Sequence, residues 1–478
     1  MKRMKTKKTI FLTGASGNMG HEGFKQLLER ADRFNLVVLV LPTKKDKKIM
    51  APYEHLPGVK IVWGDLTNYE DVVQCVAGAD YVLHVGGMVS PAADYLPALT
   101  TKVNIGAAQN IVKAIQAQPN RDEIKLVYIG TVAQTGDRNP PLHWGRTGDP
   151  IRISTYDNYA LTKTIAEREV IESGLNYWVS LRQTGLLYPG LDKGLDPIMF
   201  HVPVNGVFEW ATAKDSGRLL ANVCEESVPE EFWRRIYNIG GGAPYRTHNY
   251  EFMQRSGQAA GIDVRRVFDL NWFATQNFHG QWYEDSDVLE NYLHFRSGSV
   301  ADYLAEVTQK SVASRWLAKL IPAALIRQYV MRPVAFQKDY GTMYWLKNKV
   351  EEKVKAYFGS EEHWLKIPSW ENFTPETPSV TPRRLHHGYD EAKPSRELDL
   401  QDMAGAAAFR GGACLSTAMK TGDLTSKLHW KCALAHEFEA SPTLVLLAGH
   451  WCPTCLAAQA DGQAEAQRNP FFAQVCKR

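Results

Sequence analysis

The chain has 478 residues, a length that predicts two or three domains rather than one. Hydrophobic residues make up 44% and charged residues 22%, the proportions of an ordinary globular protein with enough apolar side chains for a sizeable core. The formal net charge of +3 excludes a strongly basic or acidic balance, so nucleic acid is not expected as a partner.

Several early lysines precede a short apolar run, Thr9 to Leu12. A secretory signal needs a run of about 7–15 apolar residues, and this one is shorter. No stretch approaches the roughly 18 uncharged apolar residues of a membrane-spanning helix. We therefore expect a cytoplasmic protein without a transmembrane segment.

The first 190 residues alternate short β-branched runs with helical patterns. Strands are predicted at Thr9–Thr13, Leu36–Leu41, Lys60–Trp63, Tyr81–Val85, Lys125–Ile129 and Trp178–Arg182. Helices are predicted at Gly20–Arg30, Tyr69–Val76 and Val103–Ala117. Strands separated by helices of this length form βαβ units, in which the strands pair in parallel and helices cover both faces. The predicted fold class is α/β, with a Rossmann-type doubly wound parallel sheet over residues 1–190.

A glycine-rich loop follows the first predicted strand and opens the first helix. Here Gly14 permits a tight turn, Gly17 lets the backbone approach a pyrophosphate, and Gly20 allows the helix to pack closely on the strand. The unpaired N–H groups at the helix N-terminus then favour the anion. We predict a dinucleotide site formed here by Gly14, Ser16, Gly17, Asn18, Met19 and Gly20.

The residues after the second strand favour NADP(H). An NAD site usually has a carboxylate there for the adenosine ribose, whereas this sequence reads Leu41-Pro42-Thr43-Lys44-Lys45. Ammonium groups attract a 2′-phosphate, so Lys44 is a predicted cofactor ligand. The alternative is a solvated lysine-rich loop, which would leave NAD as the cofactor.

Two further segments complete the predicted cofactor site. Asp65 and Leu66 follow the third strand, where the carboxylate could cap the adenine edge or serve as N-cap of the next helix. Val85 ends the fourth strand, whose carboxyl end lies at the same edge of the sheet.

Residues 191–372 are less regular and rich in aromatic side chains. Helices are predicted at Ala301–Arg332 and Tyr344–Tyr357. We expect a smaller, partly helical substrate-binding region here, with residues 205–245 returning to the sheet. The aromatics either line a pocket for a bulky apolar substrate or simply form core. They are Phe208, Trp210, Trp272, Phe273, Phe278, Trp282, Tyr283, Tyr292 and Phe295.

Residues 373–400 are typical of a linker, because prolines and polar residues dominate Thr374–Ser395. Most cysteines lie beyond it, in residues 401–478. Cys432 and His436, with Cys452 and Cys455, form a C-x3-H…C-x2-C pattern that suits tetrahedral Zn²⁺. Four protein ligands leave no open position for water, so this zinc would be structural.

The zinc-binding pattern resembles treble-clef and zinc-ribbon modules over about residues 403–460. Gly411–Ser416 and Gly449–Cys455 carry this resemblance, and Ala435 departs from it where such modules have glycine. Either Cys414 or His450 could replace one of the four ligands.

The ordered motifs of about residues 7–250 resemble the extended short-chain dehydrogenase/reductase family, also called the NAD-dependent epimerase/dehydratase family. The matching segments are Thr13–Gly20, Gly64–Leu66, Val82–Gly87, Val103-Asn104, Tyr159–Lys163, Leu181-Arg182, Tyr188–Gly190 and Tyr237–Gly241.

This resemblance implies catalytic roles for three residues. Tyr159 would give or take the proton at the substrate oxygen. Lys163 would lower the pKa of that phenol, ordinarily about 10, and hold the nicotinamide ribose. Thr131 would hydrogen-bond the reacting carbonyl. Tyr159 and Lys163 would therefore contact the cofactor as well as act in catalysis.

The chain departs from the family beside these positions. Ile129 and Gly130 stand where serines are usual, so only Thr131 and Thr135 can supply a hydroxyl. Val132-Ala133 replaces the acidic pair of dehydratases, and Gln183-Thr184 replaces the asparagine that holds a diphosphosugar.

Together these features predict an NADP(H)-dependent oxidoreductase that reduces a ketone or oxidises a secondary alcohol on a medium-sized, apolar substrate. One alternative is a nucleotide-sugar epimerase or dehydratase with tightly bound NAD(P). Another is a cofactor-dependent scaffold that acts through the zinc module. The resemblance also implies a homodimer through the helices beside Tyr159 and Lys163. The substrate and the direction of the reaction stay open.

Overall fold

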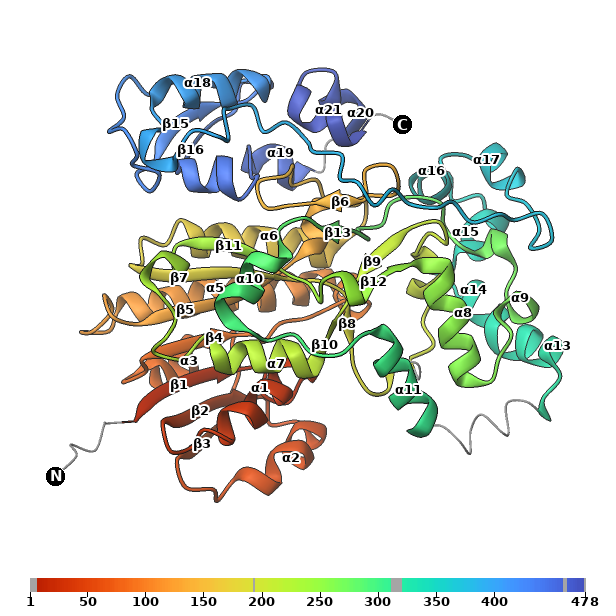
Figure 1. Cartoon of the computed structure of the whole chain (residues 1–478), viewed down its shortest axis with the longest axis horizontal. Coiled ribbons are helices and arrows are strands. Elements are labelled where there is room, and N and C mark those ends of the chain that lie inside the picture. Colours follow the sequence, from red (N-terminus) through yellow and green to blue (C-terminus); the bar gives the residue numbers. More distant parts are fainter. Residues whose placement is uncertain (1–6, 192–193, 311–319, 459–461, 477–478) are drawn as a thin grey trace.

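The computed structural model describes residues 7–191, 194–310, 320–458 and 462–476. Figure 1 shows a sheet flanked by helices, a helical region at its right-hand end, and a C-terminal unit (blue) along one side.

The sheet contains seven strands in the order β11-β7-β5-β4-β1-β2-β3, and every neighbouring pair is parallel. The strands are β1 (Lys8–Thr13), β2 (Phe34–Val40), β3 (Val59–Trp63), β4 (Tyr81–His84), β5 (Lys125–Thr131), β7 (Tyr177–Gln183) and β11 (Arg235–Ile239). This confirms the predicted doubly wound α/β fold. The strand order reverses between β1 and β4, so a crevice opens at the carboxyl ends of these two strands, where such folds bind ligands.

Helices cover both faces of the sheet, as its β-branched, doubly buried strands require. One face carries α1 (Asn18–Leu28) and α7 (Ala213–Asn222), and the other carries α3 (Tyr69–Val76), α5 (Pro97–Gln116) and α6 (Asn158–Ile171). Glycine brings α1 and α7 together, because a Cβ at Gly23 would lie 2.6 Å from a methyl carbon of Leu220.

The remaining elements before the C-terminal unit are short, and many of them pack around aromatic cores. Its strands are β6 (Trp144–Gly145), β8 (Leu186–Leu187), β9 (Val207–Glu209), β10 (Ala211–Thr212), β12 (Arg246–His248) and β13 (Trp282–Tyr283). Its helices are α8 (Asn249–Ala260), α9 (Val264–Val267), α10 (Ser286–Leu293), α11 (Val300–Lys310), α13 (Ala323–Ile326), α14 (Arg332–Ala335), α15 (Thr342–Lys347), α16 (Glu351–Phe358) and α17 (Glu361–Leu365). The short helix α4 (Ala92–Tyr95) lies just before α5, and α2 (Lys44–Met50) follows β2.

The two helices predicted for this region are interrupted in the structure. Pro322 is the N-cap of α13, and residues 311–319 of the predicted helix lie outside the described residues. The second predicted helix divides into α15 and α16, because Lys349 adopts a left-handed backbone with φ +53°.

The C-terminal unit is built on a three-stranded antiparallel sheet. Its elements are α18 (Leu400–Phe409), β14 (Ala413–Cys414), β15 (Leu428–Lys431), β16 (Glu437–Ala440), α19 (Pro453–Ala458), α20 (Gly462–Ala466) and α21 (Pro470–Cys476). Trp430, Leu444 and Trp451 share one apolar core with Ala166 and Val170 of α6. This unit therefore packs directly on the outward side of α6.

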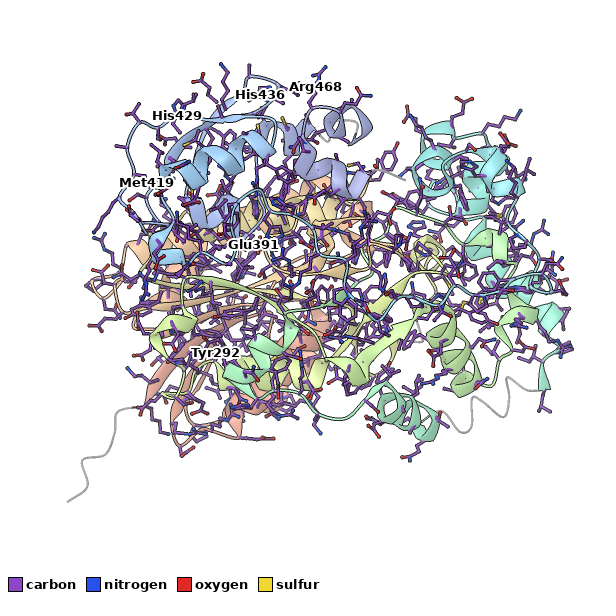
Figure 2. The ribbon with its side chains drawn as sticks, turned by 45° about the horizontal axis from the view of Figure 1, so that its top comes forward. Tyr292, Glu391, Met419, His429, His436 and Arg468 are labelled. Carbon is purple, nitrogen blue, oxygen red and sulfur yellow. The ribbon has the colours of Figure 1, made fainter. Side chains whose placement is uncertain are left out.

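The predicted linker is irregular, but it packs closely on the sheet domain. Residues 374–394 form no helix or strand. His387 nevertheless is only 1% exposed, since its ring lies 2.9 Å from a carboxylate oxygen of Asp149 and 2.8 Å from one of Glu391. Glu391 also pairs with Arg146, and Figure 2 shows it beneath the C-terminal residues His429 and His436. Composition could not reveal these long-range partners.

Across the described ranges, no helix is both long and apolar enough to span a membrane.

Candidate active site

A cavity of about 1200 Å³ opens at the carboxyl ends of the parallel strands. Most residues predicted for cofactor binding or catalysis line it. They are Gly14, Ser16, Gly17, Asn18, Met19, Gly20, Asp65, Leu66, Val85, Thr131, Tyr159 and Lys163. The sheet and helix α6 thus bring together residues that lie up to 150 positions apart in the sequence.

The glycine-rich loop has a backbone that only glycine fits. Gly14 has φ +74°, and a Cβ on it would lie 2.8 Å from the amide nitrogen of Gly86. A Cβ on Gly20 would lie 2.1 Å from the carbonyl oxygen of Gly14. No side chain caps the N-terminus of α1, so the amides of its first turn remain available to an anion. The loop therefore fits the pyrophosphate of a dinucleotide.

The predicted ligand Lys44 does not line the cavity. It begins helix α2 and is exposed, as is Lys45. Asp46 lines the cavity instead, and its carboxylate accepts a hydrogen bond from the hydroxyl of Thr43. Asp46 lies among four lysines, so sequence pattern did not single it out.

Asp65 forms a turn rather than a helix cap. Its carboxylate accepts a hydrogen bond from the amide of Thr67 at 2.8 Å, whereas Asn68 is the N-cap of α3 and accepts from the amide of Glu70. Of the two roles considered for Asp65, the N-cap is therefore excluded. Its place in the cavity leaves it available to a ligand.

Thr131 and Tyr159 meet in the lining of the cavity. Thr131 ends β5, and Tyr159 and Lys163 lie one turn apart on α6. Burial raises the pKa of Tyr159 to about 12, while a hydrogen bond with Thr131 opposes that rise. Lys163 was expected to lower the pKa of Tyr159; in the structure, Thr131 lowers it through this hydrogen bond. A phenol with this pKa is protonated at neutral pH and can donate its proton.

Lys163 is buried and also lines the cavity. Its ammonium lies 4.2 Å from the ring centroid of Tyr128, whose hydroxyl donates to the Lys163 carbonyl oxygen. Burial lowers the pKa of Lys163 to about 7, against an opposing effect of Glu167.

The N-terminus of α6 is held by two carboxylates that sequence analysis did not identify. Asp157 is the N-cap and accepts from the amide of Ala160 at 2.7 Å. Asp94, from α4, accepts from the amides of Asn158 at 2.9 Å and Tyr159 at 3.3 Å. These bonds fix the turn that presents the Tyr159 side chain to the cavity.

Glu167, one turn beyond Lys163, ties α6 to three neighbouring segments: β7, the turn after β5 and the C-terminal unit. Its carboxylate accepts hydrogen bonds from Ser180 at 2.5 Å, Gln134 at 2.8 Å and Arg182 at 2.8 and 3.0 Å. The ring of His450 lies 2.8 Å from the same carboxylate. His450 therefore contacts Glu167 and lies outside the group of potential metal ligands.

Replacing Glu167 by glutamine is expected to lower the free energy of unfolding by about 3–5 kcal/mol, because Arg182 would stay buried without its counter-charge. Burial alone would raise the pKa of Glu167, but Arg182 and His450 lower it to far below its ordinary value. The charge-dependent stabilisation is therefore present at neutral pH and is lost only as the pH falls through that low pKa. Urea unfolding of Glu167→Gln measures the effect, and Glu169→Gln on the same helix is the control. An equal loss of unfolding free energy in the two variants would contradict the prediction.

Of the nine aromatic residues considered for the pocket, only Phe278 lines the cavity. The others lie mainly in cores, such as Trp272 and Phe273 around Phe200. The aromatic wall of the cavity comes instead from Tyr156, Tyr340, Trp345 and Tyr357. Sequence pattern could not identify Trp345 and Tyr357, because their place depends on how α15 and α16 fold back onto the sheet domain.

Cys432, His436, Cys452 and Cys455 form a compact group, and their potential ligand atoms all lie within 4.8 Å of one another. His436 Nδ1 lies 3.4, 3.5 and 3.7 Å from the sulfurs of Cys455, Cys432 and Cys452, and two sulfurs are 3.8 Å apart. A tetrahedron with Zn–S bonds of about 2.3 Å and a Zn–N bond of about 2.0 Å has edges of this length. These residues therefore fit a zinc ion.

Ala435 stands where zinc modules of this kind have glycine, and its backbone conformation is one that favours glycine. Ala435 has φ +62°, the left-handed conformation in which glycine is unstrained. The turn that directs His436 toward the cysteines is thus kept here by an alanine at some conformational cost.

Residues 10–188 match the model of the NAD dependent epimerase/dehydratase family. The chain is similar to Short-chain dehydrogenase/reductase family 42E member 1 of Macaca fascicularis, with 27% identity over 225 residues that cover 43% of this chain and 52% of that protein. It is also similar to 3 beta-hydroxysteroid dehydrogenase type 7 of Rattus norvegicus, with 25% identity over 190 residues that cover 39% of this chain and 54% of that protein. The chain thus spans about half the length of the curated relatives it matches.

The fold is similar to that of a dTDP-glucose 4,6-dehydratase from Bacillus anthracis str. Ames, solved in complex with NAD. The TM-score is 0.51 at 15% sequence identity, over 65% of this chain and 98% of that chain. The family model spans β1 to β7 with helix α6 between them, which confirms the resemblance drawn from the motifs. Residues 10–188 of this chain are therefore similar to the NAD dependent epimerase/dehydratase family.

Proposed function

We propose that this chain is an NADP(H)-dependent oxidoreductase that reduces a ketone or oxidises a secondary alcohol. The observation that carries the proposal is one continuous cavity with the glycine-rich loop in one wall and Thr131 beside Tyr159 in another. A dinucleotide on that loop would have its reactive ring near the phenol, as hydride and proton transfer to one carbonyl group requires.

Each of the three residues has one task in this proposal. When bound, the dinucleotide would supply or accept the hydride at the substrate carbon. The Tyr159 hydroxyl donates its proton to the carbonyl oxygen during reduction, and the Thr131 hydroxyl holds that oxygen in place. Lys163 would bind the ribose of the nicotinamide. At neutral pH the phenol carries the proton that reduction needs, and the hydrogen bond with Thr131 opposes the rise in pKa that would make it a weaker donor.

The test is a thermal-shift screen of the purified protein with NADPH, NADH, ketones, secondary alcohols and UDP-sugars, since a ligand that binds the folded state raises the melting temperature. Absorbance at 340 nm then follows the cofactor. Net oxidation of NADPH with a ketone supports the proposal, whereas conversion of a UDP-sugar without net cofactor change supports an epimerase or dehydratase. Absence of dinucleotide binding would contradict both.

The preference for NADP(H) rests on the lysines at the start of α2 and has its own test. Replacing Lys44 and Lys45 together by alanine is expected to weaken NADPH binding about 10-fold and to leave NADH binding unchanged, because only NADPH carries the 2′-phosphate. Lys48→Ala, farther along the same exposed helix, is the control. Tighter binding of NADH than NADPH by the unaltered protein would instead favour NAD, with Asp46 at the adenosine ribose.

We also propose that Cys432, His436, Cys452 and Cys455 hold a structural zinc ion. The distances between the potential ligand atoms and the burial of the three cysteines support this. All four positions around the metal would be filled by the protein, so we assign it no part in the reaction.

A further inference from the structure

One lysine lies at the end of the cavity formed by the helical region. Lys353 is on α16 and lines the cavity with Trp345 and Tyr357 from the same region. None of the roles assigned above uses it. Lys353 lies 190 residues beyond Lys163 in the sequence, so no local pattern links it to the active site.

Aromatic rings frame the ammonium group of Lys353. Its Nζ lies 3.5 Å from the ring centroid of Tyr156, 5.4 Å from that of Trp345 and 6.0 Å from that of Tyr357. Tyr156 has an uncommon left-handed backbone, φ +70°, and its hydroxyl donates to Glu352, so its ring is held against the lysine. The aromatic faces attract the cation but offer its N–H groups no strong acceptor.

The carboxylates in the cavity bond to other parts of the chain. Asp94 accepts from Ser90 and from two amides at the start of α6, and Asp157 caps that helix. Asp196 accepts from Tyr95 and from the amide of Ile198. No carboxylate oxygen of a described residue forms an ion pair with Lys353 Nζ within 4 Å. Burial lowers the pKa of Lys353 to about 8, with Asp94 opposing, so most of the group is still charged at neutral pH.

We propose that Lys353 binds an anionic oxygen group of the substrate, a carboxylate or a phosphate, while the neighbouring rings pack against its apolar part. A cation held in a partly desolvated pocket, with N–H groups directed to no protein carboxylate, is suited to such a group. The inference rests on the proposed function and changes the expected substrate from a neutral apolar ketone to an acidic one.

The experiment compares anions with their neutral counterparts. Aryl ketones that carry a carboxylate two, four or six carbons from the carbonyl are titrated into the NADPH-loaded protein, each beside its methyl ester. UDP and uridine form the phosphate arm. We expect at least one anion to bind about 10- to 100-fold more tightly than its neutral partner. That ratio should approach one in Lys353→Met, remain in part in Lys353→Arg, and be unchanged in Lys355→Met, whose side chain is exposed on the same helix.

Each outcome has a distinct meaning. Preference for the keto acids identifies a carboxylate, and preference for UDP identifies a phosphate. A purely structural role of Lys353 would change the melting temperature but not the ratio of the two affinities. If the unaltered protein binds NADPH but favours no anion, or if Lys353→Met keeps the preference, the inference is overturned while the proposed function stands. If no dinucleotide binds, the proposed function itself fails. The ratio in the unaltered protein needs no variant, so poor folding of Lys353→Met leaves the test intact.

Discussion

Replacing Tyr159 by phenylalanine is expected to lower kcat by about 10²- to 10⁴-fold, the usual contribution of a positioned proton donor. The ring and its packing are kept and only the hydroxyl is lost, so the melting temperature and the affinity for NADPH should change little. The measurement is oxidation of NADPH at 340 nm with the ketone found by screening. Tyr177→Phe, on β7 and outside the cavity lining, is the matched control.

The same variant separates an enzyme from a scaffold. A scaffold that binds the cofactor only for its own stability would keep its biological activity in Tyr159→Phe. Turnover equal to that of the unaltered protein would contradict the role given to the phenol. Thr131→Val should be slower too, because the hydroxyl that contacts Tyr159 would be lost and the pKa of the phenol would rise further.

The elements that carry this chemistry could be predicted because their signals are local. Alternating strands and helices predict the parallel sheet, and the glycine-rich loop is marked by Gly14 and Gly20, whose positions admit no side chain. Tyr159 and Lys163 have helical spacing, so one helix alone brings them to one side. Thr131 lies at the carboxyl end of a strand, and the carboxyl ends of all strands in a parallel sheet lie at the same edge.

What could not be predicted depends on contacts between distant segments. Lys353 enters the cavity only because α15 and α16 fold back onto the sheet domain. The pairing of His387 with Asp149 turns an apparent linker into a packed strap. His450 lies two residues from Cys452 in a cysteine-rich segment, which made it a candidate ligand; its contact with Glu167 arises only when the C-terminal unit packs on α6.

That packing also bears on assembly. The outward side of α6 carries Arg168, which donates to the carbonyl oxygens of Glu439 and Trp451, and Glu172, which accepts from Ser441. The C-terminal unit thus covers a helix through which the family resemblance implied a homodimer. The homodimer stays a prediction, and it would need a different surface or a rearranged C-terminal unit.

Removing the metal is expected to have the largest effect on stability. Structural zinc contributes an apparent binding free energy of about 10–16 kcal/mol in small zinc-binding peptides. Without it, the three buried cysteines and the half-buried His436 would lose the ion that holds them together. We expect the purified protein to contain one zinc ion per chain. Cys455→Ser should lose it and destabilise the C-terminal unit by more than about 4 kcal/mol, the range reached when a structural metal is lost.

The effect of metal loss should reach the active site, because the C-terminal unit supplies His450 to Glu167 and covers α6. Hydrogen exchange is expected to rise first in β15, β16 and α19 and then in α6, with a lower affinity for NADPH as a consequence. Cys414→Ser is the control, since Cys414 lies outside the ligand group. If Cys455→Ser keeps its zinc, or exchanges hydrogen no faster than Cys414→Ser, the metal site is not the one described. If α6 alone is unaffected, the C-terminal unit is held by zinc but does not position the catalytic helix.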